Sequence, residues 1–176
     1  MMETKNKTAL VTGAASGMGA AAARMFAQAG YSVMLADMNG TAVEAAVQGL
    51  AASGYEADYT VCDVTDEAQV KAMVEKTVAR FGKLDAAYNN AGIMPARVET
   101  ADTETEAFDH VIAVNLKGVW LCMKYELLQM RRQGHGAIVN SSRGIMCAWQ
   151  KTGGDGRDFA QAARDAAIAM RDDIRR

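Results

Sequence analysis

The fold is decided by residues 8–19, TALVTGAASGMG, near the start of the chain. Residues 8–12 are a short apolar run with β-branched side chains, which is typical of a buried strand. The following residues are rich in glycine, and residues 17–29 are rich in alanine up to Gly30, which suits the end of a helix. The stretch therefore predicts a strand, a tight turn and a helix in direct succession.

Each glycine of this turn has a separate physical role. Gly13 permits the sharp turn out of the strand, Gly17 removes a Cβ where a pyrophosphate approaches the backbone, and Gly19 lets the helix pack closely on the sheet. The helix start offers free N–H groups and the positive end of a dipole to an anion. A glycine cluster by itself could be a plain tight turn, but the strand–turn–helix context favours a dinucleotide phosphate site. Ser16 and Met18 complete the predicted cofactor residues of the turn.

Asp37 lies 18 residues after Gly19, at the end of a second predicted strand over residues 32–36. A carboxylate at this place accepts hydrogen bonds from an adenosine ribose and repels a 2′-phosphate, which favours NAD over NADP. The alternative is a surface Asp that begins a turn. We include Met38, which follows it, among the predicted cofactor-binding residues.

The rest of the chain continues the alternation of strands and helices. Strands are predicted at 56–61, 84–88 and 137–140, and helices at 41–52, from Thr65 or Asp66 to Phe81, and from 103 to about 133. Such alternation predicts an α/β fold, a Rossmann-type doubly wound parallel sheet of about five strands with helices on both faces.

Two of these predicted helices carry more specific patterns. Thr41, with Glu44 three residues later, matches a capping box at a helix start. In the long helical region, five apolar residues repeat at helical spacing on one side. They are Phe108, Ile112, Leu116, Val119 and Met123.

Strand signals vanish after Trp149. We expect an NAD-binding Rossmann domain over residues 1–148 and a divergent loop with a possible helix over 149–176. The apolar stripe of that last segment is thin and mostly alanine, so a marginal helix is expected as much as a docked one.

Composition excludes several classes of protein. The 176 residues carry a net charge of −2, with 50% apolar and 23% charged residues. These values are typical of a soluble globular protein and argue against disorder, a membrane protein or a nucleic-acid-binding surface. The N-terminus lacks the apolar segment of a signal peptide, so a cytoplasmic location is expected.

The cysteines and histidines point to neither a disulfide framework nor a metal site. The three cysteines, Cys62, Cys122 and Cys147, are odd in number and lack metal-ligand spacing. His110 and His135 are interpreted as surface or loop residues.

Five short motifs follow one another along the chain: Thr12–Gly19, Asp63-Val64, Asn89-Asn90-Ala91-Gly92, Val114–Gly118 and Gly136–Asn140. With these motifs in this order, the chain resembles the short-chain dehydrogenase/reductase family. The resemblance implies that Asp63 and Val64 border the adenine, that the backbone of Asn90, Ala91 and Gly92 lines the cofactor, and that Asn115 holds a proton-relay water. It implies an orienting serine, which is Ser142 if one residue is deleted; without the deletion Arg143 takes that place.

The activity implied by the resemblance is hydride transfer between NAD(H) and an alcohol or carbonyl substrate. The family's Tyr-x-x-x-Lys pair has no match, because the last tyrosine is Tyr125 and Lys151 is the only lysine after Ser142. Three readings stay open: an NAD-dependent oxidoreductase, a non-catalytic NAD-binding or oligomerisation module, and a truncated or frameshifted gene product. The helix around Val111 to Met130 is expected to pack against a second copy in a homo-oligomer.

Overall fold

Five parallel strands form one sheet in the computed structural model, which describes residues 7–94 and 98–139. The spatial order is β3-β2-β1-β4-β5, so β1 lies in the middle with β2 on one side and β4 on the other. The doubly wound parallel sheet predicted from the sequence is confirmed. The strands are β1 (Lys7–Thr12), β2 (Tyr31–Asp37), β3 (Ala57–Val61), β4 (Ala86–Tyr88) and β5 (Ala137–Val139).

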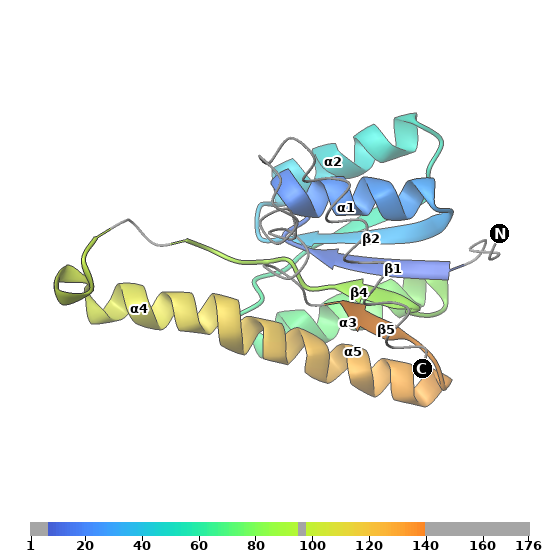
Figure 1. Cartoon of the computed structure of the whole chain (residues 1–176). Coiled ribbons are helices and arrows are strands. Elements are labelled where there is room, and N and C mark those ends of the chain that lie inside the picture. Colours follow the sequence, from blue (N-terminus) through green and yellow to red (C-terminus); the bar gives the residue numbers. More distant parts are fainter. Residues whose placement is uncertain (1–6, 95–97, 140–176) are drawn as a thin grey trace, which may run out of the picture. The chain divides into compact units, whose positions relative to one another are not determined.

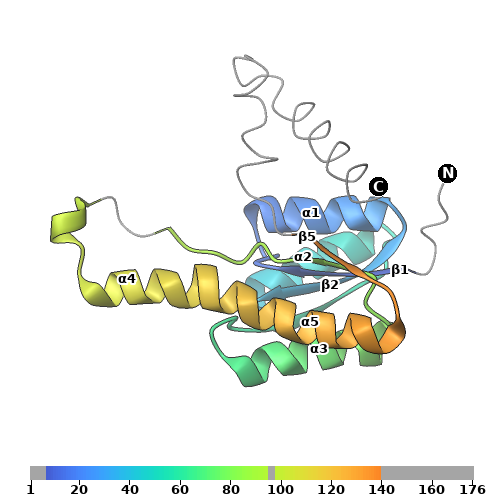
Figure 2. The same cartoon turned by 60° about the horizontal axis from the view of Figure 1, so that its bottom comes forward.

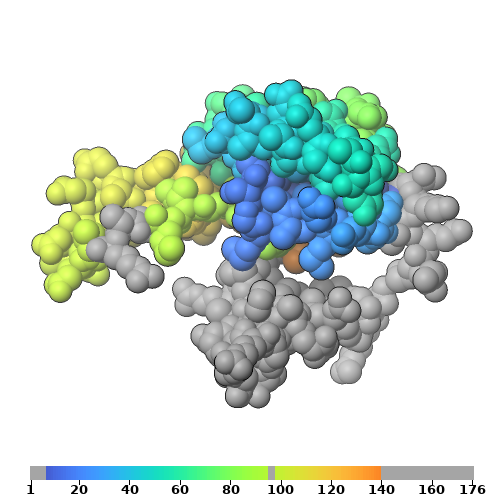
Figure 3. Space-filling model, turned by 90° about the horizontal axis from the view of Figure 1, so that it is seen from above, coloured from blue at the N-terminus to red at the C-terminus, as the bar shows by residue number. Residues whose placement is uncertain are grey.

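Helices cover both faces of the sheet. One face carries α1 (Gly17–Gln28) and α2 (Gly40–Ala52), and the other carries α3 (Glu67–Phe81) and α5 (Val119–Gln133) (Figures 1 and 2). Figure 3 looks onto this face from above, with α1 in blue and α2 in cyan. The chain between β4 and α5 contains the short turn η1 (Thr100–Asp102), helix α4 (Thr105–Ile112) and the π-helical turn η2 (Ala113–Gly118).

The core has two halves because successive strand residues point to opposite faces. Leu10 of β1 and Met34 of β2 pack on the α3 and α5 side, whereas Val11 and Leu35 pack on the α1 and α2 side. All four side chains are at most 1% exposed. A strand buried on both faces must be apolar throughout, which explains the continuous apolar runs in the sequence.

The N-cap of α2 differs from the predicted one. Asn39, in an extended conformation, accepts a 3.1 Å hydrogen bond through its side-chain oxygen from the Ala42 N–H. Thr41 lies inside the helix, so the capping box that Thr41 and Glu44 would form does not occur. Asn is as good a cap as Thr, and Gly40 then provides the first helical residue. At α3, by contrast, Asp66 is the cap, as one of the two predicted alternatives has it.

The long helical region is present, and of the five apolar residues predicted on one side of it, Val119 and Met123 are half-buried and the first three are exposed. Phe108, Ile112 and Leu116 are 58%, 38% and 63% exposed. The π-helical turn has more residues per turn than an α-helix, because its hydrogen bonds join residues five apart, so it rotates the face that meets the sheet. The buried residues of η2 and α5 are Val114, Gly118, Leu121, Cys122, Glu126 and Met130.

The remaining predictions differ little from the structure or lie beyond it. Strands β3 and β4 begin one and two residues later than expected. Residues 140–176, with Ser142, Cys147 and the predicted segment 149–176, lie outside the described residues. Within the described residues, no helix has the length and apolar character needed to cross a membrane.

Candidate functional site

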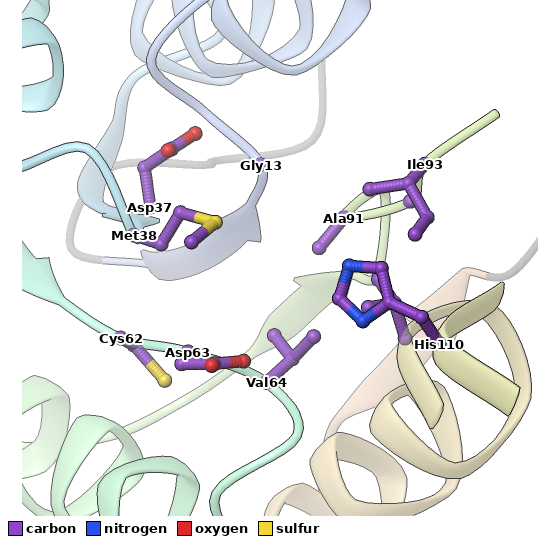
Figure 4. A pocket seen from close by; sticks show the side chains of 11 residues that line it. Gly13, Asp37, Met38, Cys62, Asp63, Val64, Ala91, Ile93 and His110 are labelled. Carbon is purple, nitrogen blue, oxygen red and sulfur yellow. The ribbon is translucent and has the colours of Figure 1, made fainter. Parts of the chain in front are cut away.

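A pocket opens where the carboxyl ends of β1, β2, β3 and β4 meet (Figure 4). In an open parallel sheet, the crevice outside the strand ends is the usual binding place, at the point where the strand order reverses. Here that point lies between β1 and β4. Residues from four strand ends and from α4 and η2 line the pocket: Gly13, Asp37, Met38, Cys62, Asp63, Val64, Ala91, Gly92, Ile93, His110 and Val114.

The glycine turn between β1 and α1 has the geometry that its sequence predicts. Gly13 and Gly17 have φ values of +62° and +54°, a region that favours glycine. A Cβ on Gly19 would collide with the carbonyl oxygen of Gly13, so α1 lies against the turn. At Gly17 nothing lies within 4 Å of where a Cβ would be, which leaves its backbone open to an approaching group.

The N-terminus of α1 is free to bind an anion. The first N–H groups of a helix have no acceptor within it, and the cap residue Ser16 makes no side-chain hydrogen bond to them. Ser16 and Met18 are exposed at this end of the helix. These four residues, Ser16 to Gly19, lie in the turn beside the pocket rather than in its lining.

Two polar residues join the β1 turn to the β4 turn. Oγ1 of Thr12 accepts hydrogen bonds from the N–H groups of Asn90 and Ala91, at 3.0 and 3.1 Å. In return, Nδ2 of Asn90 donates to the carbonyl oxygens of Thr12 and Gly13, both at 3.2 Å. Asn90 therefore supports the pocket from behind, while Ala91 and Gly92 line it.

The carboxylate of Asp37 is fixed at the end of β2. Oδ2 accepts a 3.0 Å hydrogen bond from the Ala15 N–H in the glycine turn, and Oδ1 accepts one of 3.0 Å from the Asn39 N–H. An ionised carboxylate has about four acceptor positions, so it has capacity for further donors. Met38 beside it is 71% exposed.

The segment after β3 forms another wall. Oδ1 of Asp63 accepts hydrogen bonds from the N–H and hydroxyl of Thr65, and this turn presents Val64 to the pocket. Burial, with the nearby carboxylates of Asp63 and Asp66, raises the pKa of the Cys62 thiol to about 12. Cys62 thus remains an uncharged, apolar part of the wall.

Four lining residues are not among those predicted: Cys62, Ile93, His110 and Val114. His110 is exposed, as expected, but it lies on α4 rather than in a loop, and its ring projects into the pocket between Ala91 and Val64 (Figure 4). His110 precedes Val114 by four residues, and residues at that spacing share a helix face. This spacing could have indicated His110, because Val114 begins one of the recognised motifs.

The two predicted catalytic residues have different outcomes. Asn115 lies on η2, where Oδ1 accepts from the Ile93 N–H and Nδ2 donates to the Ile93 oxygen, each at 2.8 Å. It thereby fixes one wall of the pocket, and its role with a water remains a prediction. Ser142 lies outside the described residues.

Comparison with known proteins gives a family and a set of relatives. A family model described as short chain dehydrogenase matches residues 7–146. The chain is 43% identical over 143 residues to a 2,5-dichloro-2,5-cyclohexadiene-1,4-diol dehydrogenase of Sphingobium indicum, covering 81% of this chain and 56% of that protein. It is 38% identical over 139 residues to levodione reductase of Leifsonia aquatica, covering 78% and 52%. The chain thus spans about half the length of the curated relatives it matches.

Solved structures of dehydrogenases and oxidoreductases also superpose on this chain. A xylitol dehydrogenase with NAD+ bound superposes with a TM-score of 0.77 at 34% identity, over 96% of this chain and 63% of that one. A metagenomic short-chain oxidoreductase in complex with NADP gives 0.73 at 30% identity, over 77% and 62%. The relatives therefore include proteins that bind either dinucleotide.

Proposed function

The chain belongs to the short-chain dehydrogenase family, and from this premise we propose that it binds the adenosine half of NAD. One observation carries the proposal: the glycine turn that ends in the uncapped N-terminus of α1 is bonded to the Asp37 carboxylate through the Ala15 N–H, beside the pocket that Gly13 and Asp37 line. The first suits a pyrophosphate and the second suits ribose hydroxyls. Val64, Ile93 and Val114 provide apolar contact for the adenine.

The same carboxylate supports NAD rather than NADP as the ligand. A phosphate on the ribose 2′-oxygen would meet the negative charge of Asp37, with two backbone donors already committed to that side chain. Like charges in contact disfavour binding. Solved structures of relatives contain either NAD+ or NADP. The proposed preference for NAD therefore rests on Asp37 of this chain.

Competition between the two halves of the dinucleotide tests the proposal. NADH binding is followed by its fluorescence with the 176-residue chain, and ADP-ribose or nicotinamide mononucleotide is added as competitor. We expect ADP-ribose to displace NADH nearly as well as NAD+ does, and the mononucleotide to displace it poorly, because the described site contains the adenosine side. Absence of NADH binding, or the reverse order of the two competitors, would contradict the proposal.

We also propose that this dinucleotide site serves an oxidoreductase activity. The reaction would be oxidation of an alcohol or reduction of a carbonyl compound. A bound nicotinamide dinucleotide supplies the hydride chemistry. Of the chain's own residues, Asn115 fixes Ile93 beside the site. None of the five tyrosines, all among the described residues, lines the described pocket, and the Tyr125 hydroxyl donates to Glu67 at 2.8 Å. We therefore assign dinucleotide binding to the described part of the chain, and no proton transfer to its tyrosines.

Homo-oligomerisation through the long helix is a second proposal, favoured by a row of exposed apolar residues. Phe108, Ile112, Leu116 and Trp120 follow one another at intervals of four along α4, η2 and α5, and Trp120 is 54% exposed. Residues at this spacing lie on one side of a helix. An exposed apolar row on one element fits the same row of a second copy, and pairing the two would remove both from water.

A charge in this row is expected to reduce self-association. We expect Trp120→Glu to shift the chain from dimer toward monomer in sedimentation equilibrium, because an unpaired carboxylate would be buried in the pairing face. The matched control is Met25→Glu, which places the same charge on an apolar side chain of α1 that is 66% exposed. A dimer unaffected by Trp120→Glu but broken by Met25→Glu would place the interface elsewhere.

A further inference from the structure

Glu126 on α5 is a carboxyl group within the apolar core. Its relative exposure is 0%, and its neighbours in sequence on the buried face are Cys122 and Met130. Figure 2 shows α5 lying along the sheet beside α3. An ionised carboxylate in such surroundings needs a cation or several donors. Within the described residues, its one recorded hydrogen bond is from Nδ2 of Asn89 to Oε2, at 2.8 Å, and no Lys, Arg or His forms an ion pair with it.

This hydrogen bond leaves two buried oxygens without a partner. They are Oε1 of Glu126 and Oδ1 of Asn89, and in the described part of the chain they are the buried side-chain atoms recorded in that state. One belongs to each of the two side chains that are already joined. Both are acceptors, so they cannot satisfy one another, and an unsatisfied buried polar atom is costly. One proton placed on Oε1 supplies a donor for this pair of atoms.

We infer that Glu126 holds a proton in the folded chain and donates it from Oε1 to Oδ1 of Asn89, so that the pair positions the pocket segment Asn90–Gly92. An acid and an amide that exchange two hydrogen bonds form a closed ring, with each side chain both donating and accepting. Asn89 directly precedes Asn90, which binds the carbonyl oxygens of Thr12 and Gly13. The ring therefore anchors the β4 turn to α5 from the side opposite the glycine turn.

The surroundings of Glu126 favour the protonated form. Burial raises the pKa of Glu126 to about 7, against the lowering effect of the Asn89 hydrogen bond. The thiol of Cys122 on the same helix, and that of Cys62 after β3, stay neutral because burial raises the pKa of each. Burial likewise raises the pKa of Tyr88 on β4, and β5 has no ionisable residue. The charged residues of α3 that form ion pairs do so at the surface: Glu67, Lys71, Glu75 and Arg80.

The sign of the pH dependence follows from the raised pKa. Between the ordinary carboxyl value of 4.5 and about 7, the folded chain binds a proton that the unfolded chain has released. Stability therefore falls as the pH rises through this window, and it levels off above about 7. The expected change from this group is on the order of a hundredfold in the unfolding equilibrium constant.

Glu126→Gln tests the inference, because an amide permanently has the donor that the protonated acid provides. Unfolding by urea is measured between about pH 5 and about pH 8 for wild type, Glu126→Gln and the control Glu44→Gln, whose side chain is exposed on α2. We expect wild type and Glu44→Gln to lose stability with rising pH by the same factor. Glu126→Gln is expected to lack this component and to exceed wild type at about pH 8. All other residues are the same in wild type and Glu126→Gln, so their contributions to the pH dependence cancel in this comparison.

Several results would overturn the inference. One is that the stability of Glu126→Gln depends on pH with the same slope as that of wild type. Another is that this variant is less stable than wild type by the same amount at about pH 5 and at about pH 8. The second result is expected if a water joins an ionised Glu126 to Asn89. A variant that fails to fold would show that the site requires a carboxylate. Wild type alone gives a second measurement: the infrared C=O band of a buried protonated carboxyl should be present at about pH 5 and vanish at about pH 8. Its absence would also overturn the inference.

The positioning role has its own readout, and it rests on the proposed nucleotide site. ADP-ribose affinity of wild type should decrease above about pH 7 relative to that of Glu126→Gln, because ionisation opens the ring behind Asn90. If ADP-ribose binds but both proteins show the same pH profile, Glu126 does not position the segment. If ADP-ribose does not bind at any pH, the proposed function fails, while the stability profile still decides whether Glu126 holds the proton.

Discussion

Gly19→Ala is expected to abolish most of the nucleotide affinity of the chain. The new Cβ would collide with the Gly13 carbonyl oxygen and lie 2.7 Å from Nδ2 of Asn90. Both are parts of the turn that holds the pyrophosphate site, and a backbone atom cannot move aside as a flexible side chain can. Loss of even one backbone N–H bond to a phosphate would cost about 1.5–3 kcal/mol, or roughly 10- to 100-fold in ADP-ribose affinity. The collision itself should destabilise the fold by about 1–3 kcal/mol.

Gly49→Ala provides the matched control, since it is the same substitution in the interior of α2. Nothing lies within 4 Å of where its Cβ would be. Alanine there should stabilise the chain by about 0.5–1 kcal/mol and leave ADP-ribose affinity unchanged. Calorimetric titration and urea unfolding of both variants give the two quantities. Gly19→Ala binding ADP-ribose like wild type would show that the nucleotide does not use this turn.

Asp37→Ala is expected to change which dinucleotide the chain prefers. Removing the carboxylate removes acceptors for the ribose hydroxyls, which should lower NAD+ affinity about 10- to 100-fold. It also removes the charge that opposes a 2′-phosphate, so NADP+ affinity should not fall and the ratio of the two should shift by at least about tenfold. Fluorescence titration with NADH and NADPH measures the ratio directly.

Two further variants separate the causes of this effect. Asp37→Asn retains one acceptor oxygen without the charge, so it should tolerate NADPH while losing less NADH affinity than Asp37→Ala. Asp102→Ala removes the same charge from an exposed residue of η1 and should alter neither affinity. An NADH-to-NADPH ratio that stays constant in Asp37→Ala would rule out Asp37 as the discriminating residue.

The central part of the fold could be predicted from the sequence because local pattern and tertiary environment agree there. Residues 9–11 and 33–36 are apolar, and the structure buries every one of them to 1% exposure or less. The glycine turn has the positive φ values that its residues permit. Asp37, Asp63 and Ala91 meet at one pocket because parallel strands end at the same edge of a sheet, which is a consequence of topology and not of any single motif.

The parts that were not predicted depend on tertiary geometry. The π-helical turn at Ala113–Gly118 rotates the helix between Ile112 and Val119. A prediction that assumes regular α-helical spacing does not include this rotation. His110 enters the pocket because α4 directs it there, although its sequence context is that of a surface residue. Glu126 stands in a predicted helix as one acidic residue among others; its burial follows from the packing of α5 against α3 and the sheet.

The joining of β1 to β4 has a consequence for how the chain folds. Paired residues of β1 and β2, such as Lys7 and Tyr31, are 24 positions apart, but Asn90 bonds to Thr12 across a sequence separation of 78 residues. Closing so long a loop costs conformational entropy that grows with its length, and contacts of high sequence separation slow folding. The two walls of the pocket thus come from the early-closing and the late-closing halves of the chain. A dinucleotide bound between the two walls would contact both ends of this 78-residue segment. Because it would bind only when the two ends are together, it would stabilise the folded state.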